Sequence, residues 1–236
     1  MKGRLDTLLL LAIILCSISG SHAQTQAAAQ TPASRSEETE WTWEVRPSQV
    51  DPRLPNVLLV GDSITRNYFP EVQRQLANAA NVYLFAVSTS VGDPRLARQL
   101  QEFASMENVP FQVVHFNNGM HGWTYSEDEY KNAFPSLLHE LRQIAPKASL
   151  IWATITPVRG EKLPGPTNAR IDVRNSIALS FVAKEGIPVD DQHALMTHHT
   201  DQYQDDVHFN PAGASIQGAQ VAEFVRAALA KVSHSK

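Results

Sequence analysis

Short apolar runs alternate with longer amphipathic stretches from residue 56 to the C-terminus. The apolar runs have the length of buried strands and cover 56–60, 82–85, 111–116, 150–154 and 187–189. Helical periodicity marks the stretches between them, at 68–76, 95–103, 127–144 and 168–184, and a last helix follows Pro211. Wholly apolar strands that alternate with helices are typical of a parallel sheet covered on both faces. We therefore predict an α/β fold, a three-layer α/β/α sandwich around a central, mostly parallel five-stranded sheet.

The residues at the helix ends agree with this prediction. Ser126 and Glu129 have the spacing of a capping box before the third helix. Gly186 follows the fourth helix, and Asn210 with Pro211 supplies a cap and a first-turn proline for the last one.

The N-terminus has the pattern of a secretion signal. Two basic residues precede an apolar run at 8–15, and small residues at 21 and 23 suit a cleavage site after Ala23. The run is shorter than the roughly 20 residues that a membrane-spanning helix needs. We expect a signal peptide at 1–23 and a secreted or periplasmic protein without stable membrane insertion.

Residues 24–45 are expected to form a flexible linker and N-terminal arm, ahead of a domain at 46–236. Ala, Gln, Ser, Thr and Glu dominate this segment up to about residue 40, so it has little to bury. Trp41 and Trp43 alternate, so their side chains share one side if the segment is extended. We favour an arm that lies on the domain over an arm that stacks on carbohydrate.

Composition narrows the class of protein. The 236 residues are 43% hydrophobic and 19% charged, which excludes collagen-like, coiled-coil and wholly disordered chains. The formal net charge is −4 and no basic run occurs, so we expect no nucleic-acid partner. The single cysteine, Cys16, lies in the predicted leader, so the processed chain has no disulfide, thiolate or cysteine-zinc chemistry.

The motif Gly61-Asp62-Ser63-Ile64-Thr65 directly follows the first predicted strand. A serine at a strand-to-helix turn presents its hydroxyl at the sheet edge where ligands bind, and its own N–H can face the same reacting carbonyl. The motif is not the G-x-S-x-G elbow of the α/β-hydrolases, because Thr65 stands in place of the second glycine. Such a serine is also a common helix cap.

A second polar cluster, Asp205-Asp206-Val207-His208, follows the fifth predicted strand. A serine hydroxyl is a weak nucleophile unless a histidine, held in one tautomer by a carboxylate, takes its proton. A local turn can bring Asp205 to His208, which then faces Ser63. Alone, this spacing also fits a solvated polar loop.

Together, GDSIT and DDVHFNPAG strongly resemble the motifs of the SGNH (GDSL-type) hydrolase superfamily, and the resemblance covers essentially the whole domain. It implies the flavodoxin-like fold of that superfamily, with Ser63 as nucleophile and His208 as general base. Asp205 is then the orienting acid, and Asp206 is a less well-spaced alternative.

The resemblance also implies an oxyanion hole. Its donors would be the backbone N–H groups of Ser63 and Gly92, although Gly92 also suits a simple turn. The family's usual Gly-x-Asn-Asp reads G-M-H-G from residue 119, so a histidine replaces the asparagine. His121 is our first candidate for the third donor and Asn118 the second, with Asn117 a further alternative.

Other polar and aromatic residues near the motifs need separate interpretation. Trp123 and Tyr125 are candidates for contacts to an acyl or sugar group. Four potential metal ligands lie near Asp205, namely His193, His198, His199 and Asp201. They lack the helical spacing of a zinc site, so we favour a solvated, mobile loop over a metal site. His115 lies in an apolar strand and is expected to be a hydrogen-bonded core residue. We expect no metal and no organic cofactor.

These expectations describe an exported serine esterase that works through an acyl-enzyme. Its substrate would be an acylated small molecule or carbohydrate, with short acyl (acetyl) groups on carbohydrate as the first choice. The alternatives are a lipid acyl hydrolase or thioesterase, an O-acyltransferase, and a catalytically silent binding module of the same fold. The histidine at position 121 is the feature that supports the silent module.

Overall fold

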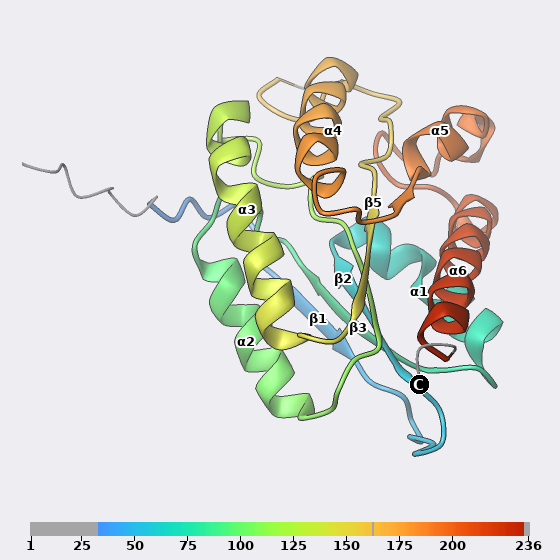
Figure 1. Cartoon of the computed structure of the whole chain (residues 1–236). Coiled ribbons are helices and arrows are strands. Elements are labelled where there is room, and N and C mark those ends of the chain that lie inside the picture. Colours follow the sequence, from blue (N-terminus) through green and yellow to red (C-terminus); the bar gives the residue numbers. More distant parts are fainter. Residues whose placement is uncertain (1–32, 162, 234–236) are drawn as a thin grey trace, which may run out of the picture. The chain divides into compact units, whose positions relative to one another are not determined.

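The computed structural model describes residues 33–161 and 163–233, which all belong to one compact unit, Thr31–Lys236. The predicted signal peptide and the first part of the predicted linker lie outside the described residues. Within them, helices cover both faces of a central sheet (Figure 1).

The sheet has six strands in the order β1-β3-β2-β4-β5-β6. Strands β2 to β6 are parallel, whereas β1 pairs antiparallel with β3 at the edge. The strands are β1 (Thr42–Val45), β2 (Asn56–Gly61), β3 (Asn81–Val87), β4 (Val113–Phe116), β5 (Ser149–Ala153) and β6 (Val189–Asp190). The predicted α/β fold with a mostly parallel sheet is confirmed, and its five strands correspond to β2–β6.

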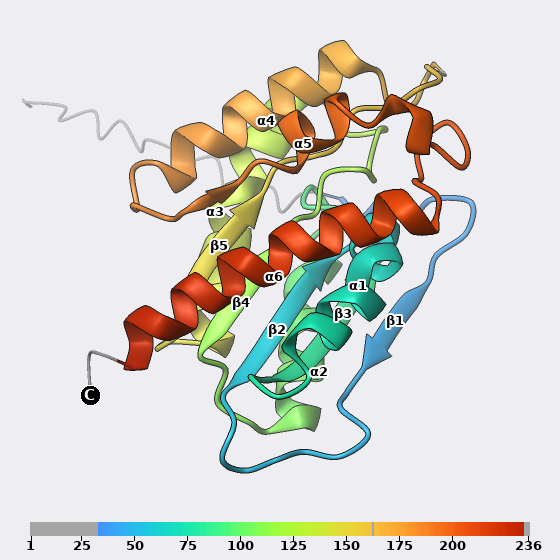
Figure 2. The same ribbon diagram turned by 90° about the vertical axis from the view of Figure 1, so that its right-hand side faces the viewer.

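The helices form a layer on each face of the sheet. Figures 1 and 2 show α2, α3 and α4 on one face and α1 and α6 on the other. The helices are α1 (Ser63–Leu76), α2 (Arg95–Glu107), α3 (Glu127–Ile144), α4 (Asn168–Val182), α5 (Gln192–Thr197) and α6 (Pro211–Ser233). The predicted bounds of the third helix and its capping box are confirmed.

Two hydrophobic clusters, one on each face of the sheet, hold the layers together. There are two because neighbouring residues of a strand face opposite sides. Leu58 of β2 belongs to the cluster under α2, α3 and α4, whereas Leu59 belongs to the cluster under α1 and α6. Both side chains are fully buried, and each such burial contributes about 1.5–3 kcal/mol. Between them the clusters fix which face of each helix points inward.

The N-terminal segment 33–45 contains an edge strand that sequence analysis did not predict. β1 lies within this segment. Just beyond β3, the N–H of Ser88 donates to the carbonyl oxygen of Trp41, and the N–H of Trp41 donates to Oγ of Ser88. The expected boundary at residue 46 therefore falls after an edge strand. β1 is mostly exposed and is held by backbone hydrogen bonds, so it has no apolar run that sequence analysis could detect.

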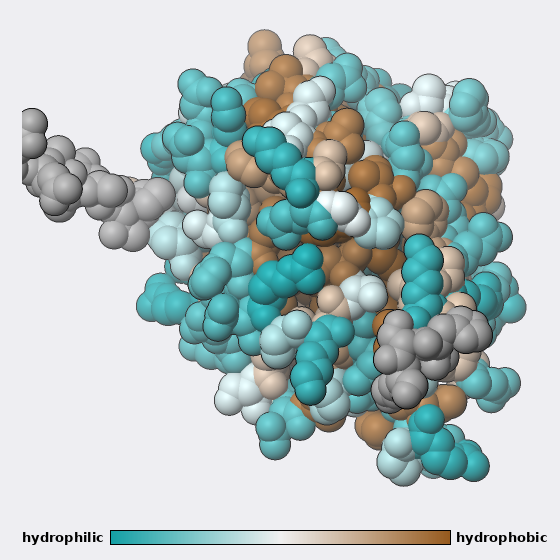
Figure 3. Space-filling view, in the orientation of Figure 1, coloured by the Kyte–Doolittle hydropathy of each residue, from teal (hydrophilic) through white to brown (hydrophobic). Residues whose placement is uncertain are grey.

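Apolar side chains also reach the surface of the domain. Among the described residues, no helix is long and apolar enough to span a bilayer. Figure 3 shows brown apolar side chains mainly in the upper and central part of this face, with teal hydrophilic ones around them. Val173 and Leu179 of α4 are among the exposed apolar residues.

Candidate active site

The carboxyl ends of β2, β3 and β4 meet at one edge of the sheet. Gly61 at the end of β2 pairs with Ala86, and Val60 pairs with Phe116. The segments that leave these strands therefore begin side by side, which is where open α/β sheets bind their ligands. They carry the predicted residues Ser63, Gly92 and His121.

Ser63 is the first residue of α1, five residues earlier than the predicted helix start. The buried Asp62 is the N-cap, and its carboxylate accepts a hydrogen bond from the N–H of Ile64 at 3.0 Å. The N–H groups of a first helical turn have no partner within the helix, so that of Ser63 is available to a ligand. Position 61, just before Asp62, requires glycine, because a Cβ there would lie 2.0 Å from Oγ1 of Thr65.

The structure brings Ser63, His208 and Asp205 together. Oγ of Ser63 lies 2.8 Å from Nε2 of His208, and Nδ1 of the same ring lies 2.9 Å from Oδ2 of Asp205. This is the geometry in which a ring can take a proton from a hydroxyl while a carboxylate holds its tautomer. The ring of His208 is about one third exposed, so the cluster opens to the surface.

Asp205 is held as a carboxylate by a local turn. Burial raises the pKa of its carboxyl group, but hydrogen bonds from the backbone N–H groups of His208 and Val207 and from the His208 ring outweigh this, and the pKa is about 2. The two backbone bonds end on Oδ1, at 2.7 and 2.8 Å, and leave Oδ2 to the ring. Asp205 therefore carries its negative charge at neutral pH.

Asp206, the alternative acid, faces another part of the chain. Its carboxylate lies 3.8 Å from the guanidinium group of Arg159, and its backbone oxygen accepts a hydrogen bond from the Arg159 N–H. Among the two neighbouring aspartates, Asp205 is the one bonded to His208.

Asn67 is a supporting residue that sequence analysis missed. It lies one helical turn after Ser63, and its side-chain amide donates a 2.7 Å hydrogen bond to the carbonyl oxygen of Phe209. The bond ties α1 to the residue after His208, so it helps to hold the ring near the hydroxyl. The i, i+4 spacing from Ser63 was the available signal.

Gly92 lies in the turn after β3, against the ring of Tyr125. A Cβ on Gly92 would lie 2.7 Å from a ring carbon of Tyr125, closer than carbon atoms pack. The hydroxyl of Tyr125 accepts a 2.8 Å hydrogen bond from the N–H of Arg35, and its side chain is buried. The structure thus places Tyr125 beneath the turn, where it supports Gly92.

The two asparagines considered as oxyanion donors each give one amide hydrogen to a backbone carbonyl oxygen. The amide of Asn118 donates to the carbonyl oxygen of Thr89 at 3.0 Å, and that of Asn117 donates to the carbonyl oxygen of Ala153 at 2.7 Å. Both bonds are buried, and they link the loop after β4 to the loop after β3 and to the end of β5.

His121 binds a carboxylate that sequence analysis did not connect with the site. Its Nδ1 lies 2.8 Å from Oε2 of Glu37, a residue of the segment expected to be a flexible linker. Burial lowers the pKa of His121, but the hydrogen bond to Glu37 and the charges of Asp62, Glu37 and Glu40 raise it above its ordinary value.

Trp123 is partly buried beside two arginines. The guanidinium group of Arg174 lies 3.9 Å from its ring centre, and its indole N–H donates to the carbonyl oxygen of Met120 at 2.7 Å. The ring is therefore fixed next to the loop that carries His121.

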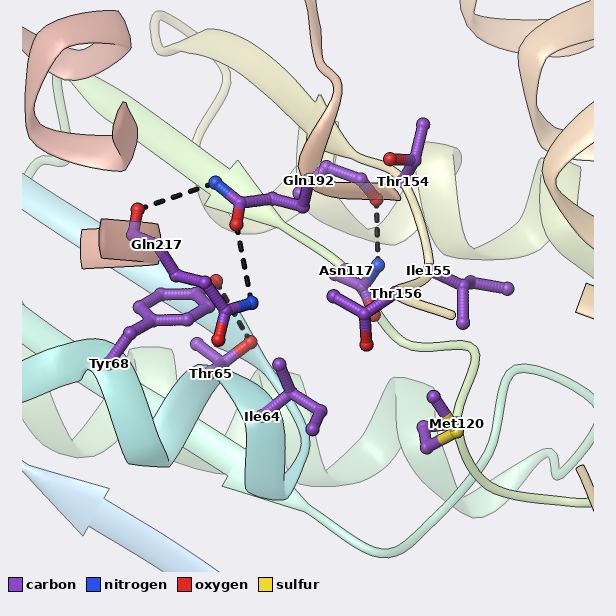
Figure 4. Close-up of a pocket in the computed structure, with 11 residues that line it drawn as sticks. Ile64, Thr65, Tyr68, Asn117, Met120, Thr154, Ile155, Thr156, Gln192 and Gln217 are labelled. Atoms are coloured by element: carbon purple, nitrogen blue, oxygen red, sulfur yellow. Dashed lines mark hydrogen bonds between the residues drawn. The ribbon is translucent and has the colours of Figure 1, made fainter. Parts of the chain in front are cut away.

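A small pocket opens behind the first turn of α1 (Figure 4). Its cavity volume is about 10 Å³, close to what a single water molecule requires. Ile64, Met120 and Ile155 form an apolar end, whereas Gln192 and Gln217 are joined by hydrogen bonds at the other.

The remaining histidines do not form a metal site among the described residues, where no group of three or more ligand-type side chains gathers. The region expected to be a mobile loop instead contains α5 and a 3₁₀ turn at Thr200–Gln202. His115 is a fully buried core residue, as predicted, with Nε2 at 2.9 Å from Oδ2 of the equally buried Asp190.

Comparison with solved structures finds the same fold. An acetyl xylan esterase is 15% identical and has a TM-score of 0.58, over 72% of this chain and 99% of that one. The C-terminal catalytic domain of peptidoglycan O-acetyltransferase A from Streptococcus pneumoniae is 18% identical, with a TM-score of 0.57 over 75% and 95%. A lipase/acylhydrolase from Enterococcus faecalis is 19% identical, with a TM-score of 0.60 over 74% and 96%.

Sequence comparison identifies the family. No curated protein matches the chain. The model of the GDSL-like lipase/acylhydrolase family matches residues 59–216, a range that runs from β2 into α6 and includes both Ser63 and His208. The chain therefore belongs to the GDSL-like lipase/acylhydrolase family and is a carboxylic ester hydrolase.

Proposed function

We propose that the protein is an exported serine esterase that removes short acyl groups, chiefly acetyl, from carbohydrate. The observation that carries the proposal is the chain of contacts from Oγ of Ser63 through the His208 ring to the Asp205 carboxylate, at 2.8 and 2.9 Å. In this assignment Ser63 is the nucleophile, His208 the general base and Asp205 the acid that orients it.

The reaction has two steps. Oγ of Ser63 attacks the ester carbonyl as Nε2 of His208 takes its proton, and the alcohol leaves with that proton. Water, activated by the same ring, then attacks the acyl-enzyme, and the acid is released. The N–H groups of Ser63 and Gly92, with His121 as the third donor, stabilise the negative oxygen formed in each step.

Two arguments support a short acyl group on carbohydrate. Two proteins of the same fold are an acetyl xylan esterase and a peptidoglycan O-acetyltransferase. The leader predicted at 1–23 would bring the enzyme to polysaccharides outside the cytoplasm.

The test compares wild type with Ser63→Ala on p-nitrophenyl esters of increasing chain length and on acetylated polysaccharides. We expect turnover to be highest for acetyl and to fall by roughly 10⁶-fold in the variant, as when a catalytic serine is removed. A fluorophosphonate probe should label the wild type at Ser63. Equal rates for the two proteins, or no labelling, would overturn the proposal.

An O-acyltransferase is the second candidate, because one solved structure of the same fold is an O-acetyltransferase domain. Both activities begin with an acyl-Ser63 intermediate, so labelling does not separate them. Added sugar acceptors do: a transferase moves the acetyl group to the sugar hydroxyl, whereas the proposed esterase releases acetate at an unchanged rate. A preference for long acyl chains would instead indicate a lipid acyl hydrolase.

A further inference from the structure

The segment before β1 reaches the loop after β4 through one carboxylate. Oε2 of Glu37 lies 2.8 Å from Nδ1 of His121, and Oε1 accepts a 2.9 Å hydrogen bond from the N–H of Gly122. The two oxygens therefore bind a side chain and the backbone of consecutive residues. This bidentate arrangement fixes both the ring and the loop that carries it.

The ring of His121 is held from several sides. Trp41 packs edge-on against it, with the ring centres 5.7 Å apart. The N–H of Met120 donates to Oδ2 of Asp62 at 3.3 Å, which ties the loop to the residue before Ser63. Arg174 donates to the carbonyl oxygen of His121 at 2.9 Å. Only 16% of the His121 side chain is exposed, so it has little freedom to turn.

The contact with Glu37 decides which nitrogen can donate. A carboxylate only accepts hydrogen bonds, so Nδ1 must carry a proton in the bond to Glu37. A neutral ring then has no proton on Nε2 and cannot stabilise an oxyanion through it. An imidazolium ring carries protons on both nitrogens and can.

The charges around His121 favour the imidazolium form. Glu37 and Glu40 face it from the N-terminal segment, and Asp62 faces it from the N-terminus of α1. The positive groups nearby are Arg174, bonded to the carbonyl oxygen of His121, and Arg66, which lies over the ring of Trp41.

The pKa values of the two partners shift in opposite directions, each toward the charged form of its group. The pKa of His121 is raised, for the causes given above. Burial raises the pKa of Glu37, but hydrogen bonds from His121 and Gly122 outweigh burial and hold it below its ordinary value. Both shifts favour a charged pair.

We propose that Glu37 is a positioning residue that keeps His121 as an imidazolium ion, so that its Nε2–H donates to the oxyanion formed at Ser63. This inference rests on the proposed esterase function. It gives the histidine that replaces the family's usual asparagine a catalytic use, and it makes the segment before β1 part of the catalytic apparatus.

The inference predicts an alkaline limb in the pH profile. As pH rises, His121 loses its second proton and the Nε2–H donor disappears, so kcat should fall. In Glu37→Gln the ring should lose its second proton at lower pH. The amide oxygen can keep the hydrogen bond from Gly122, and the amide nitrogen then donates to Nδ1, so the neutral ring carries its proton on Nε2 and the alkaline limb should disappear. In wild type, kcat should drop by up to about a hundredfold on this limb while KM changes little, because only the transition state is affected.

The experiment follows kcat and KM on a short p-nitrophenyl ester from pH 6 to 10 for wild type, Glu37→Gln and Glu38→Gln. Glu38 is the matched control, since it is the next residue and is exposed. The ring of His121 is followed in parallel by NMR titration. An unchanged titration of His121 in Glu37→Gln, or an equal effect in Glu38→Gln, would overturn the inference.

A second variant, His121→Asn, separates the donor role from a structural one. An asparagine amide donates at every pH, so this variant should stay active and lose the alkaline limb, and adding Glu37→Gln should have little further effect. An equal change in the pH profile from Glu37→Gln in both backgrounds would show that Glu37 acts by another route and overturn the inference. Failure of the esterase function is distinguishable, because it would remove the difference between wild type and Ser63→Ala while the NMR titration of His121 still reports the contact with Glu37.

Discussion

Nε2 of His208 lies 2.8 Å from Oγ of Ser63, although 145 residues separate the two along the chain. Ser63 is placed by the first strand-to-helix turn, and His208 by the loop that leads into the last helix. Asn67 joins these two regions through its hydrogen bond to the carbonyl oxygen of Phe209. The contact therefore depends on the packing of α1 beside α6, which share a hydrophobic cluster.

The choice between the two adjacent aspartates gives the first prediction. Asp205→Asn should lower kcat by about 10⁴-fold, because an amide removes the charge and no longer enforces the tautomer that leaves Nε2 of His208 free to accept a proton. Asp206→Asn is the matched control and should change kcat less than about threefold, because Asp206 faces Arg159. Steady-state kinetics on a p-nitrophenyl ester measure both effects, and a larger loss of kcat in Asp206→Asn would reverse the assignment.

The low pKa of Asp205 also predicts how stability depends on pH. Its pKa is about 2 in the folded protein, below the roughly 4 of an unfolded chain, so the ionised group favours folding. This contribution is fully present above pH 4 or so and is lost as pH falls toward 2. The free energy of unfolding of wild type should exceed that of Asp205→Asn at pH 5, and the gap should narrow at pH 3.

Urea unfolding of both proteins at pH 5, 4 and 3 measures that gap. Half of the Asp205 side chain is exposed, so the gap is expected to be small. A gap that widens as pH falls would mean that the carboxylate is not stabilised by the contacts described.

Sequence analysis anticipated those contacts of the candidate site that have local signals. Ser63 follows an apolar strand, and Asp205 lies one turn before His208, so spacing alone could bring each group to the right edge. Glu37 gave no such signal, because its partner His121 is 84 residues away and its neighbours are polar. Only the folded chain shows which of many acidic residues reaches the loop.

The same reasoning explains the elements that were missed. β1 is four residues long and mostly exposed, so its pairing with β3 rests on backbone hydrogen bonds that any sequence can make. α5 has six residues, too few for a helical period to stand out. Its N-cap Asp191, which accepts from the N–H of Ala194, was the only local sign.

Gly92 provides a prediction about the oxyanion hole. In Gly92→Ala the new Cβ would lie 2.7 Å from the Tyr125 ring, which is buried and cannot easily move. The turn must shift instead, so kcat should fall roughly a hundredfold and the free energy of unfolding by about 1–3 kcal/mol. Kinetics and urea unfolding measure the two effects.

A smaller residue at position 125 should relieve the clash. Gly92→Ala with Tyr125→Leu should therefore recover much of kcat relative to Gly92→Ala alone. Tyr125→Leu by itself serves as the control, and it should keep kcat near wild type if Tyr125 only supports the turn. A double variant no more active than Gly92→Ala would mean that the ring does not displace the turn.

The buried pair of His115 and Asp190 gives a prediction about stability. Both side chains are fully buried, and Asp190 also accepts hydrogen bonds from Gln192 and Gln220. His115→Leu removes the ring and leaves the carboxylate without its partner, so the free energy of unfolding should fall by about 3–5 kcal/mol. Asp190→Asn in the same chain should restore part of this loss, because a buried amide costs less than a buried carboxylate that has lost its histidine partner. Urea unfolding of wild type, both single variants and the double variant measures the coupling, and strictly additive losses would mean that the two groups do not interact.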